Sequence, residues 1–180
     1  MLFRSEGRTP PAFDILAWNN DSTRMPAAMH SFYLRHFYLE NEFSRGELEL
    51  FGERLGPKLV DVDTFIVAAE NDHIAPWRTS FLSTGLLGGD VTFTLSTAGH
   101  IAGVVNPPSP KAKHWRGTVA TGEAPDPDGW RQRAEEVTGS WWESWTAWIE
   151  ERAGDMRTPP PPGSSSHPPL EDAPGSYVRG

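Results

Sequence analysis

Short apolar runs that end in polar residues set the pattern in the middle of this sequence. Residues 64–69 form one such run and residues 91–97 form a second. Their length and their β-branched and aromatic content predict two buried strands. Between them, Pro76 precedes the segment 77–87, which ends at two glycines and is predicted to be a helix. A helix between two strands favours parallel pairing, so we expect an α/β fold.

The pattern also predicts elements on the N-terminal side of these strands. The apolar run 13–18 is typical of a strand, and the turn residues that follow it lead to Pro26. Residues 27–43 then carry a wide, aromatic-rich apolar band, which predicts a helix that begins after the proline. Alternation of polar and apolar residues over 47–51 predicts a further strand.

Large side chains recur at helical spacing near the C-terminus. They predict one face of a helix that starts near residue 126, with Gly139 interrupting it; the stripe consists of Trp130, Ala134, Val137, Trp141, Trp145 and Trp148. A surface for stacking carbohydrate or a cofactor is the alternative. We favour a packing face, because each indole buries a large area when it enters a core.

The ends of the chain differ in composition from its middle. Residues 1–11 are polar with two prolines and are expected to be an irregular lead-in without the apolar segment of a signal peptide. Residues 155–180 are rich in proline and serine and cannot bury a core, so we expect a mostly extended or disordered tail.

Composition excludes several classes of function. The 180 residues suffice for one domain, and the formal net charge of −8 without a basic cluster argues against nucleic-acid binding. An apolar run of about 20 residues, which a membrane span needs, is missing from the sequence. The sequence contains no cysteine, which excludes disulfides and thiolate metal sites. The cytoplasm is the expected compartment.

Two residues at predicted strand ends carry the strongest chemical signal. Asp72 follows the strand 64–69, and His100 follows the strand 91–97. An acid after one strand and a histidine after the next is the order of the second half of an α/β-hydrolase triad. His100 would then be the general base and Asp72 the residue that orients its ring. The alternative is a turn-capping aspartate and an incidental loop histidine.

The nucleophile of such a triad is missing from the sequence. Neither a cysteine nor a G-x-S-x-G segment, which would form the tight turn that presents a nucleophile, is present. The sequence therefore predicts the C-terminal part of a larger enzyme. Asp61 and Asp63 are less suitable acids than Asp72, because they precede their strand and would lie at its opposite end.

Three further residues are weaker candidates. His73 could shape the site, although a role in the turn is favoured. Trp18 and Asp21 end another predicted strand, where an indole could wall a pocket, but a core tryptophan and a capping carboxylate are the simpler interpretation. We expect no metal site, because the histidines show no H-x-x-x-H or H-E-x-x-H spacing.

Several stretches together resemble one enzyme family, the class I poly(3-hydroxyalkanoate) synthases, in the C-terminal part of their catalytic domain. These stretches are Trp18-Asn19-Asn20-Asp21, Tyr33-Leu34-Arg35-His36, Asp72-His73-Ile74-Ala75-Pro76-Trp77, Gly99-His100-Ile101-Ala102-Gly103-Val104-Val105-Asn106-Pro107-Pro108, Lys113-His114-Trp115, the segment 139–148 and Pro174-Gly175-Ser176-Tyr177-Val178.

The resemblance implies a fold and a division of the chain. Residues 12–154 would be the C-terminal portion of an α/β-hydrolase-like domain, a mostly parallel sheet with flanking helices, in which residues 22–43 end the cap region. A Pro/Ser-rich tail would follow at 155–180.

The resemblance also implies an activity. The family is an acyltransferase that polymerises (R)-3-hydroxyacyl-CoA into polyester through a Cys-His-Asp triad. Asp72 matches the triad acid and His100 the base. Trp18 and Asp21 match the W-N-x-D stretch near the active site, and His73 lies beside the acid.

Partners and location follow from the same resemblance. The substrates would be (R)-3-hydroxyacyl-CoA and the growing polyester chain, and coenzyme A would leave as product, so no cofactor is expected. A homodimer of the full-length enzyme, granule-associated proteins and a place at the surface of cytoplasmic polyester granules are implied.

The family's cysteine has no counterpart in this sequence, so we expect the chain alone to be inactive. Two other functions stay open: an α/β-hydrolase fragment, such as an esterase or depolymerase, and a non-catalytic piece for dimerisation or granule association.

Overall fold

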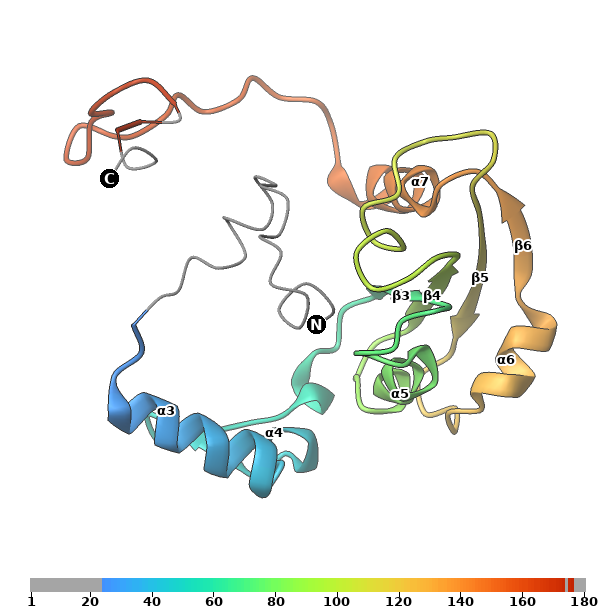
Figure 1. Cartoon of the computed structure of the whole chain (residues 1–180). Coiled ribbons are helices and arrows are strands. Elements are labelled where there is room, and N and C mark those ends of the chain that lie inside the picture. The colour runs from blue at the N-terminus through green and yellow to red at the C-terminus, as the bar shows by residue number, and fades with distance from the viewer. Residues whose placement is uncertain (1–23, 174, 177–180) are drawn as a thin grey trace, which may run out of the picture.

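A four-stranded mixed sheet carries the hydrophobic core in the computed structural model, which describes residues 24–173, 175 and 176 (Figure 1). The strands lie in the order β3 (Thr64–Ala69), β4 (Val91–Ser96), β5 (Lys113–Val119) and β6 (Glu135–Thr138). β3 and β4 pair in parallel, whereas β4–β5 and β5–β6 pair antiparallel.

The expected α/β architecture is confirmed, but the expectation of a mostly parallel sheet is wrong for the described residues. One of the three strand pairings in this sheet is parallel. The reason lies in the connections. Helix α5 (Trp77–Leu82) lies between β3 and β4 and allows a parallel crossover, whereas the segment 97–112 between β4 and β5 contains no helix. A strand that returns without a crossover pairs antiparallel.

The central strands were predicted closely. β3 matches the predicted strand, and β4 ends one residue earlier than expected. α5 begins directly after Pro76, as predicted, and continues as a 3-10 turn at Ser83–Gly85 instead of a full helix to residue 87.

The core lies on the face of the sheet that α5 and α6 (Pro127–Arg133) cover. Phe81 packs edge-on against Phe93, with 4.9 Å between ring centroids, and Phe93 packs in the same way against Trp130. Because side chains alternate along a strand, the neighbours of Phe93 point to the opposite face. There Phe65 contacts Trp148 of α7 (Trp141–Ala153). The sheet thus lies between α5 and α6 on one face and α7 on the other.

The tryptophan stripe is not one helix face, which corrects the expectation from its spacing. Strand β6 separates α6 from α7, and Gly139 adopts a left-handed φ of 110° between them. Trp130 is buried in the core, whereas Trp145 is 42% exposed on α7. Pairing with β5 gives residues 135–138 a sheet partner that their helical periodicity does not reveal.

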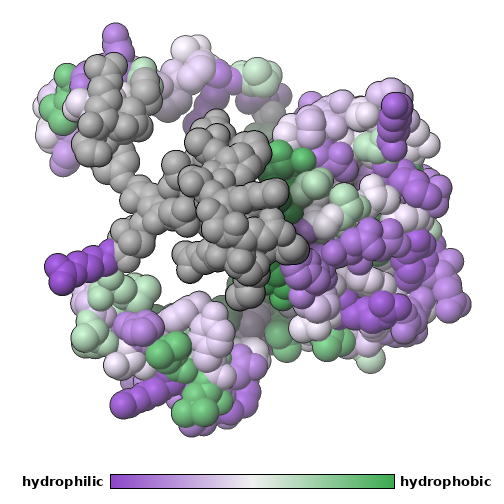
Figure 2. Space-filling view, viewed as in Figure 1, coloured by the Kyte–Doolittle hydropathy of each residue, from purple (hydrophilic) through white to green (hydrophobic). Residues whose placement is uncertain are grey.

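The described N-terminal part is a separate helical segment with a small hairpin. Helix α3 (Ala27–Tyr33) continues as a π-helix at Leu34–Leu39, and the left-handed Asn41 separates it from α4 (Glu42–Arg45), so the predicted helix 27–43 is broken. β1 (Leu48–Leu50) pairs antiparallel with β2 (Glu53–Leu55), followed by the 3-10 turn Pro57–Leu59. Figure 2 shows hydrophobic side chains on the surface of this helical segment. Leu39 at its end is 75% exposed.

The C-terminal end of the described chain leads away from the sheet (Figure 1). α7 ends at Ala153 with Gly154 as its C-cap, and the described residues beyond it contain no helix or strand. The predicted strand 13–18 lies outside the described residues.

Candidate active site

The ends of two parallel strands place Asp72 and His100 side by side. β3 and β4 pair from Thr64 with Val91 to Ala69 with Ser96, so both strands end at the same edge of the sheet. The loops that follow are joined to each other, because the Asn71 N–H donates to the Ala98 carbonyl at 3.0 Å. Sites in parallel sheets form at such carboxyl edges.

Asp72 and His100 are directly hydrogen bonded. His100 Nδ1 lies 2.8 Å from Asp72 Oδ2. The carboxylate side chain is 8% exposed, whereas the imidazole is 45% exposed. A charged carboxylate only accepts hydrogen bonds, so His100 Nδ1 is the donor, and in the neutral ring Nε2 is the nitrogen with the free lone pair. This arrangement fits a base oriented by an acid.

The second carboxylate oxygen of Asp72 is held by its own turn. Asp72 Oδ1 accepts from the backbone N–H groups of Ile74 at 2.8 Å and Ala75 at 2.9 Å. The Ala75 N–H is the largest cause that lowers the pKa of Asp72 to about 2; partial burial opposes it, and the bonds from His100 and Ile74 act in the same direction as that from Ala75. The acid is therefore charged at neutral pH.

The loop that carries His100 begins with a strained residue. Ala98 adopts a φ of 82°, in the left-handed region that an L side chain disfavours. Its carbonyl accepts the N–H of Asn71, so the strained conformation serves the contact between the two loops. Strain of this kind collects at functional sites.

Of the remaining three candidate residues, the structure describes one. His73 is exposed beside Asp72 and makes no hydrogen bond within the described part of the chain. Trp18 and Asp21 lie outside the described residues, as does the start of the expected cap segment 22–43. Of the five candidates, the structure brings Asp72 and His100 into contact.

Comparison with known proteins gives a consistent result, although no family model matches the chain. The chain is 47% identical over 175 residues to the poly(3-hydroxyalkanoate) polymerase subunit PhaC of Rhizobium meliloti, which covers 97% of the chain and 28% of that protein. It is 47% identical to the poly(3-hydroxyalkanoate) polymerase of Methylorubrum extorquens, covering 96% of the chain and 28% of that protein. PhaC of Cupriavidus necator is 42% identical, with coverage of 97% and 30%.

The chain belongs to the poly(3-hydroxyalkanoate) polymerase family. It spans less than a third of the length of these curated relatives and matches a C-terminal part of them. The resemblance drawn from the Gly-His-Ile-Ala-Gly stretch and its neighbours is thereby confirmed at the level of the polymerase family.

Residues to which the sequence analysis gave no role in the site shape the His100 loop of this polymerase-family chain. Gly103 is buried close to Ala69, and Asn106 Nδ2 donates to Ser96 Oγ at 3.1 Å. Ser140 Oγ donates to the Asn106 carbonyl and caps α7, with Glu143 completing a capping box. The S-x-x-E spacing is a signal for a helix start at Trp141, and it would have divided the tryptophan stripe correctly.

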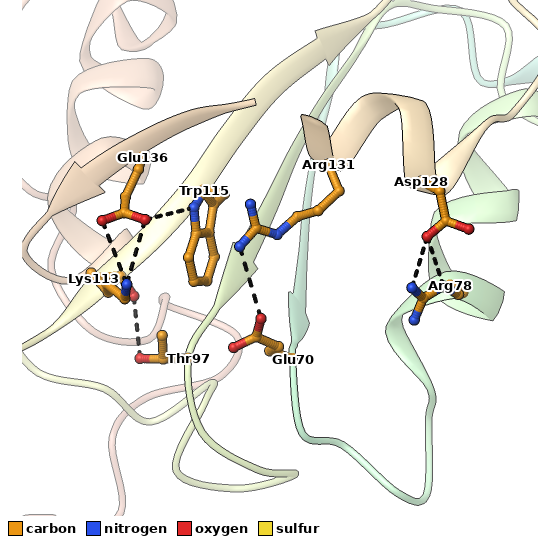
Figure 3. A network of polar contacts seen from close by, with 8 residues as sticks. All are labelled: Glu70, Arg78, Thr97, Lys113, Trp115, Asp128, Arg131 and Glu136. Atoms are coloured by element: carbon orange, nitrogen blue, oxygen red, sulfur yellow. Dashed lines mark hydrogen bonds and ion pairs between the residues drawn. The ribbon is translucent and has the colours of Figure 1, made fainter. Parts of the chain in front are cut away.

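A brace of charged and aromatic side chains supports the end of β3 (Figure 3). The guanidinium of Arg131 lies 3.6 Å from the ring centre of Trp115 and 3.9 Å from Glu70, two residues before Asp72. Trp115 Nε1 donates to Glu136 at 3.0 Å. The brace joins α6, β5 and β6 to the strand that carries the acid.

A second histidine, His114, is buried between β5 and α7. Its Nδ1 donates to the Gly139 carbonyl at 3.0 Å, and its Nε2 accepts from the Ser144 hydroxyl at 2.8 Å. Burial lowers the pKa of His114, so the ring is held neutral. Ser144 lines a cavity of about 470 Å³ beneath α7 that neither Asp72 nor His100 lines.

Two features are absent from the described residues. They contain no group of three or more histidine, cysteine, aspartate or glutamate side chains placed to hold a metal ion. In the same part of the chain, no helix is long and apolar enough to cross a membrane.

Proposed function

We propose that this chain provides the base and the acid of a poly(3-hydroxyalkanoate) polymerase, an acyltransferase that converts (R)-3-hydroxyacyl-CoA into polyester and releases coenzyme A. The observation that carries the proposal is the 2.8 Å hydrogen bond between Asp72 and His100 at the ends of two adjacent parallel strands. That arrangement fits an α/β-hydrolase-like catalytic domain. The names of the relatives supply the reaction class.

His100 acts twice in the proposed reaction. Its Nε2 first takes the proton of a cysteine thiol, and the thiolate attacks the thioester carbonyl while coenzyme A leaves with the proton. The resulting acyl-enzyme then transfers its acyl group to the hydroxyl of another monomer or chain end, which His100 deprotonates. The cysteine is regenerated as the thiol.

Asp72 keeps the imidazole ready for both steps. Its charged carboxylate accepts the Nδ1 proton, which fixes the tautomer that leaves Nε2 free, and stabilises the imidazolium when Nε2 is protonated. The exposed imidazole is open to a reacting group, whereas the acid is shielded.

The nucleophile of the proposed reaction comes from outside these residues, because the 180-residue sequence contains no cysteine. Trp18, Asp21 and His73 are the proposed substrate-pocket residues. We also propose a homodimer of the full-length enzyme, contact with granule-associated proteins and a place at the granule surface. No cofactor is required, since coenzyme A enters with the substrate.

A hydrolase would use the same acid and base but would transfer the acyl group to water. The Asp72–His100 geometry does not distinguish the two reactions, and the polymerase names of the relatives favour the acyltransferase.

Coenzyme A release from (R)-3-hydroxybutyryl-CoA tests the proposal. The chain alone should release no more than a buffer blank, since loss of a triad nucleophile lowers the rate about 10⁶-fold. Mixing it with the separately expressed, cysteine-containing remainder of the Rhizobium meliloti relative should restore release and polymer formation. The same mixture with His100→Gln should stay at the blank.

Two results would contradict the proposal. Turnover by the chain alone would show that the nucleophile lies within it. Restored turnover that His100→Gln leaves unchanged would remove the histidine from the reaction.

A further inference from the structure

The start of α7 lies against the loop that carries His100. The indole N–H of Trp141 is 3.1 Å from both the Gly103 and the Val104 carbonyl oxygens. The indole N–H of Trp142 is 3.0 Å from the Val104 carbonyl. Two side chains from one helix turn thus donate to two consecutive carbonyls of the catalytic loop, which runs beside α7 in Figure 1.

The carbonyls that accept these hydrogen bonds belong to a compact turn, residues 99–105. Within it, the Gly103 N–H donates to the Gly99 carbonyl and the Val105 N–H to the Ile101 carbonyl, both at 2.8 Å. His100 lies in the first part of this turn, and the carbonyls that receive the indoles lie in its last part. A displacement of that last part is therefore transmitted to His100 through these bonds and the Val104 N–H bond to the Ile101 carbonyl at 3.1 Å.

Apolar burial does little to hold this turn. Its large apolar side chains face solvent: Ile101 is 60% exposed, Val104 44% and Val105 61%. In this part of the molecule, polar contacts to α7 therefore replace packing as the means of fixing the loop.

The two indoles are themselves held rigidly. Their rings pack edge to face with 6.3 Å between centroids, and the capping box of Ser140 and Glu143 fixes the helix start that precedes them. Ser140 also donates to Asn106, so the loop end and the helix start are joined at a third point.

We propose that Trp141 and Trp142 are positioning residues, which hold the turn 99–105 so that His100 Nδ1 stays on Asp72. We call the indole contacts of Trp141 and Trp142 to this turn the clamp. Its role in catalysis rests on the proposed function, but its effect on the His100–Asp72 hydrogen bond can be measured without turnover. The indole N–H is the group that matters, since phenylalanine keeps an aromatic ring but donates no hydrogen bond.

Imidazole NMR of the full 180-residue chain tests the clamp. The Nδ1 proton of His100, assigned by its loss in His100→Gln, should give a slowly exchanging signal because Asp72 accepts it. In the double variant Trp141→Phe/Trp142→Phe we expect this proton to exchange at least about tenfold faster, and each single variant to lie between.

Trp145→Phe is the matched control. Trp145 belongs to the same helix but is exposed, and its indole makes no hydrogen bond within the described residues. This variant should leave the His100 signal unchanged. An equal effect in Trp145→Phe would overturn the clamp, because it would show a general response of α7.

Loss of the fold is separated from loss of the clamp by thermal unfolding of each variant. If the double phenylalanine variant does not fold, 3-benzothienylalanine at both positions keeps the fused ring and replaces the N–H donor with sulfur. Faster exchange in a cooperatively folded protein supports the clamp, and unchanged exchange overturns it. The NMR measurement does not depend on turnover, so a negative polymerisation assay would contradict the proposed function without deciding for or against the clamp.

Discussion

Both oxygens of the Asp72 carboxylate are in use, and this is what makes the residue suitable as a triad acid. Oδ1 closes the turn through Ile74 and Ala75, and Oδ2 holds His100. The turn bonds fix the carboxylate independently of the histidine, so the imidazole has a preorganised acceptor.

His114 should make stability depend on pH. Burial lowers the pKa of His114 in the folded chain below its ordinary value of 6.5. Below that pH the unfolded chain binds more protons at this residue than the folded chain does, so stability should fall as the pH drops from 6.5 toward the folded pKa. We would measure the free energy of unfolding in urea at about pH 7.5 and about pH 5.5. The difference between the two values should be smaller in His114→Gln than in the unchanged chain.

The matched control for this measurement is His167→Gln. His167 is exposed in the C-terminal segment and hydrogen bonds to Ser166. This variant should keep the pH dependence of the unchanged chain. A His114→Gln protein with the full pH dependence would show that other groups produce it.

At the scale of elements, the loop between β4 and β5 depends on close backbone approach. A Cβ at Gly103 would overlap the Cβ of Ala69 and lie 2.8 Å from the Gly99 carbonyl oxygen. Gly103→Ala should therefore push the turn away from β3, lower stability by about 1–3 kcal/mol and weaken the Asp72–His100 bond. Thermal unfolding and the His100 imidazole NMR signal measure the two effects.

Gly99→Ala provides the comparison at a position next to His100. The nearest atom to a Cβ there is the Asn71 carbonyl oxygen at 3.7 Å, an ordinary contact, and its φ is not left-handed. It should leave the Asp72–His100 signal in place. Equal disturbance by both variants would mean that overlap of a new Cβ at Gly103 with Ala69 is not the cause of the effect.

Local pattern predicted the elements that carry the two catalytic candidates but not the rest of the sheet. β3 and β4 are visible in the sequence because they are continuous apolar runs. β5 buries His114 and leaves Arg116 half-buried on the α7 side, so its pattern does not read as a core strand. β6 is a strand because it pairs with β5, and its two glutamates give no strand signal by themselves.

The same distinction applies to the site. The positions of Asp72 and His100 after two strands were enough to predict their contact. The contacts of Asn106 and Ser140 depend on how α7 returns to the loop, which no local pattern in the sequence specifies.

For the whole molecule, the outer edge of β3 is a point of weakness. The Thr64 and Glu70 N–H groups donate toward the β4 side, so by alternation those of Phe65 and Val67 point outward. No strand among the described residues pairs with this edge. Unpaired edges favour association, so we expect the isolated chain to self-associate as its concentration rises.

Sedimentation velocity with a proline variant tests this expectation. Val67→Pro removes an outward N–H and should reduce the association, whereas Ile66→Pro removes an inward N–H and should unfold the sheet. An unchanged chain that stays monomeric over the whole accessible concentration range would refute the edge argument.

A graft into a complete relative tests the central claim, that this chain carries the base and acid of a polymerase. The homologous segment of the Rhizobium meliloti polymerase subunit would be replaced by this chain, which is 47% identical to it. The measurement is coenzyme A release from (R)-3-hydroxybutyryl-CoA by the purified chimera. We expect turnover by the chimera, a loss of about 10⁴-fold with Asp72→Asn and a greater loss with His100→Gln. A folded, active chimera whose turnover neither substitution changes would contradict it.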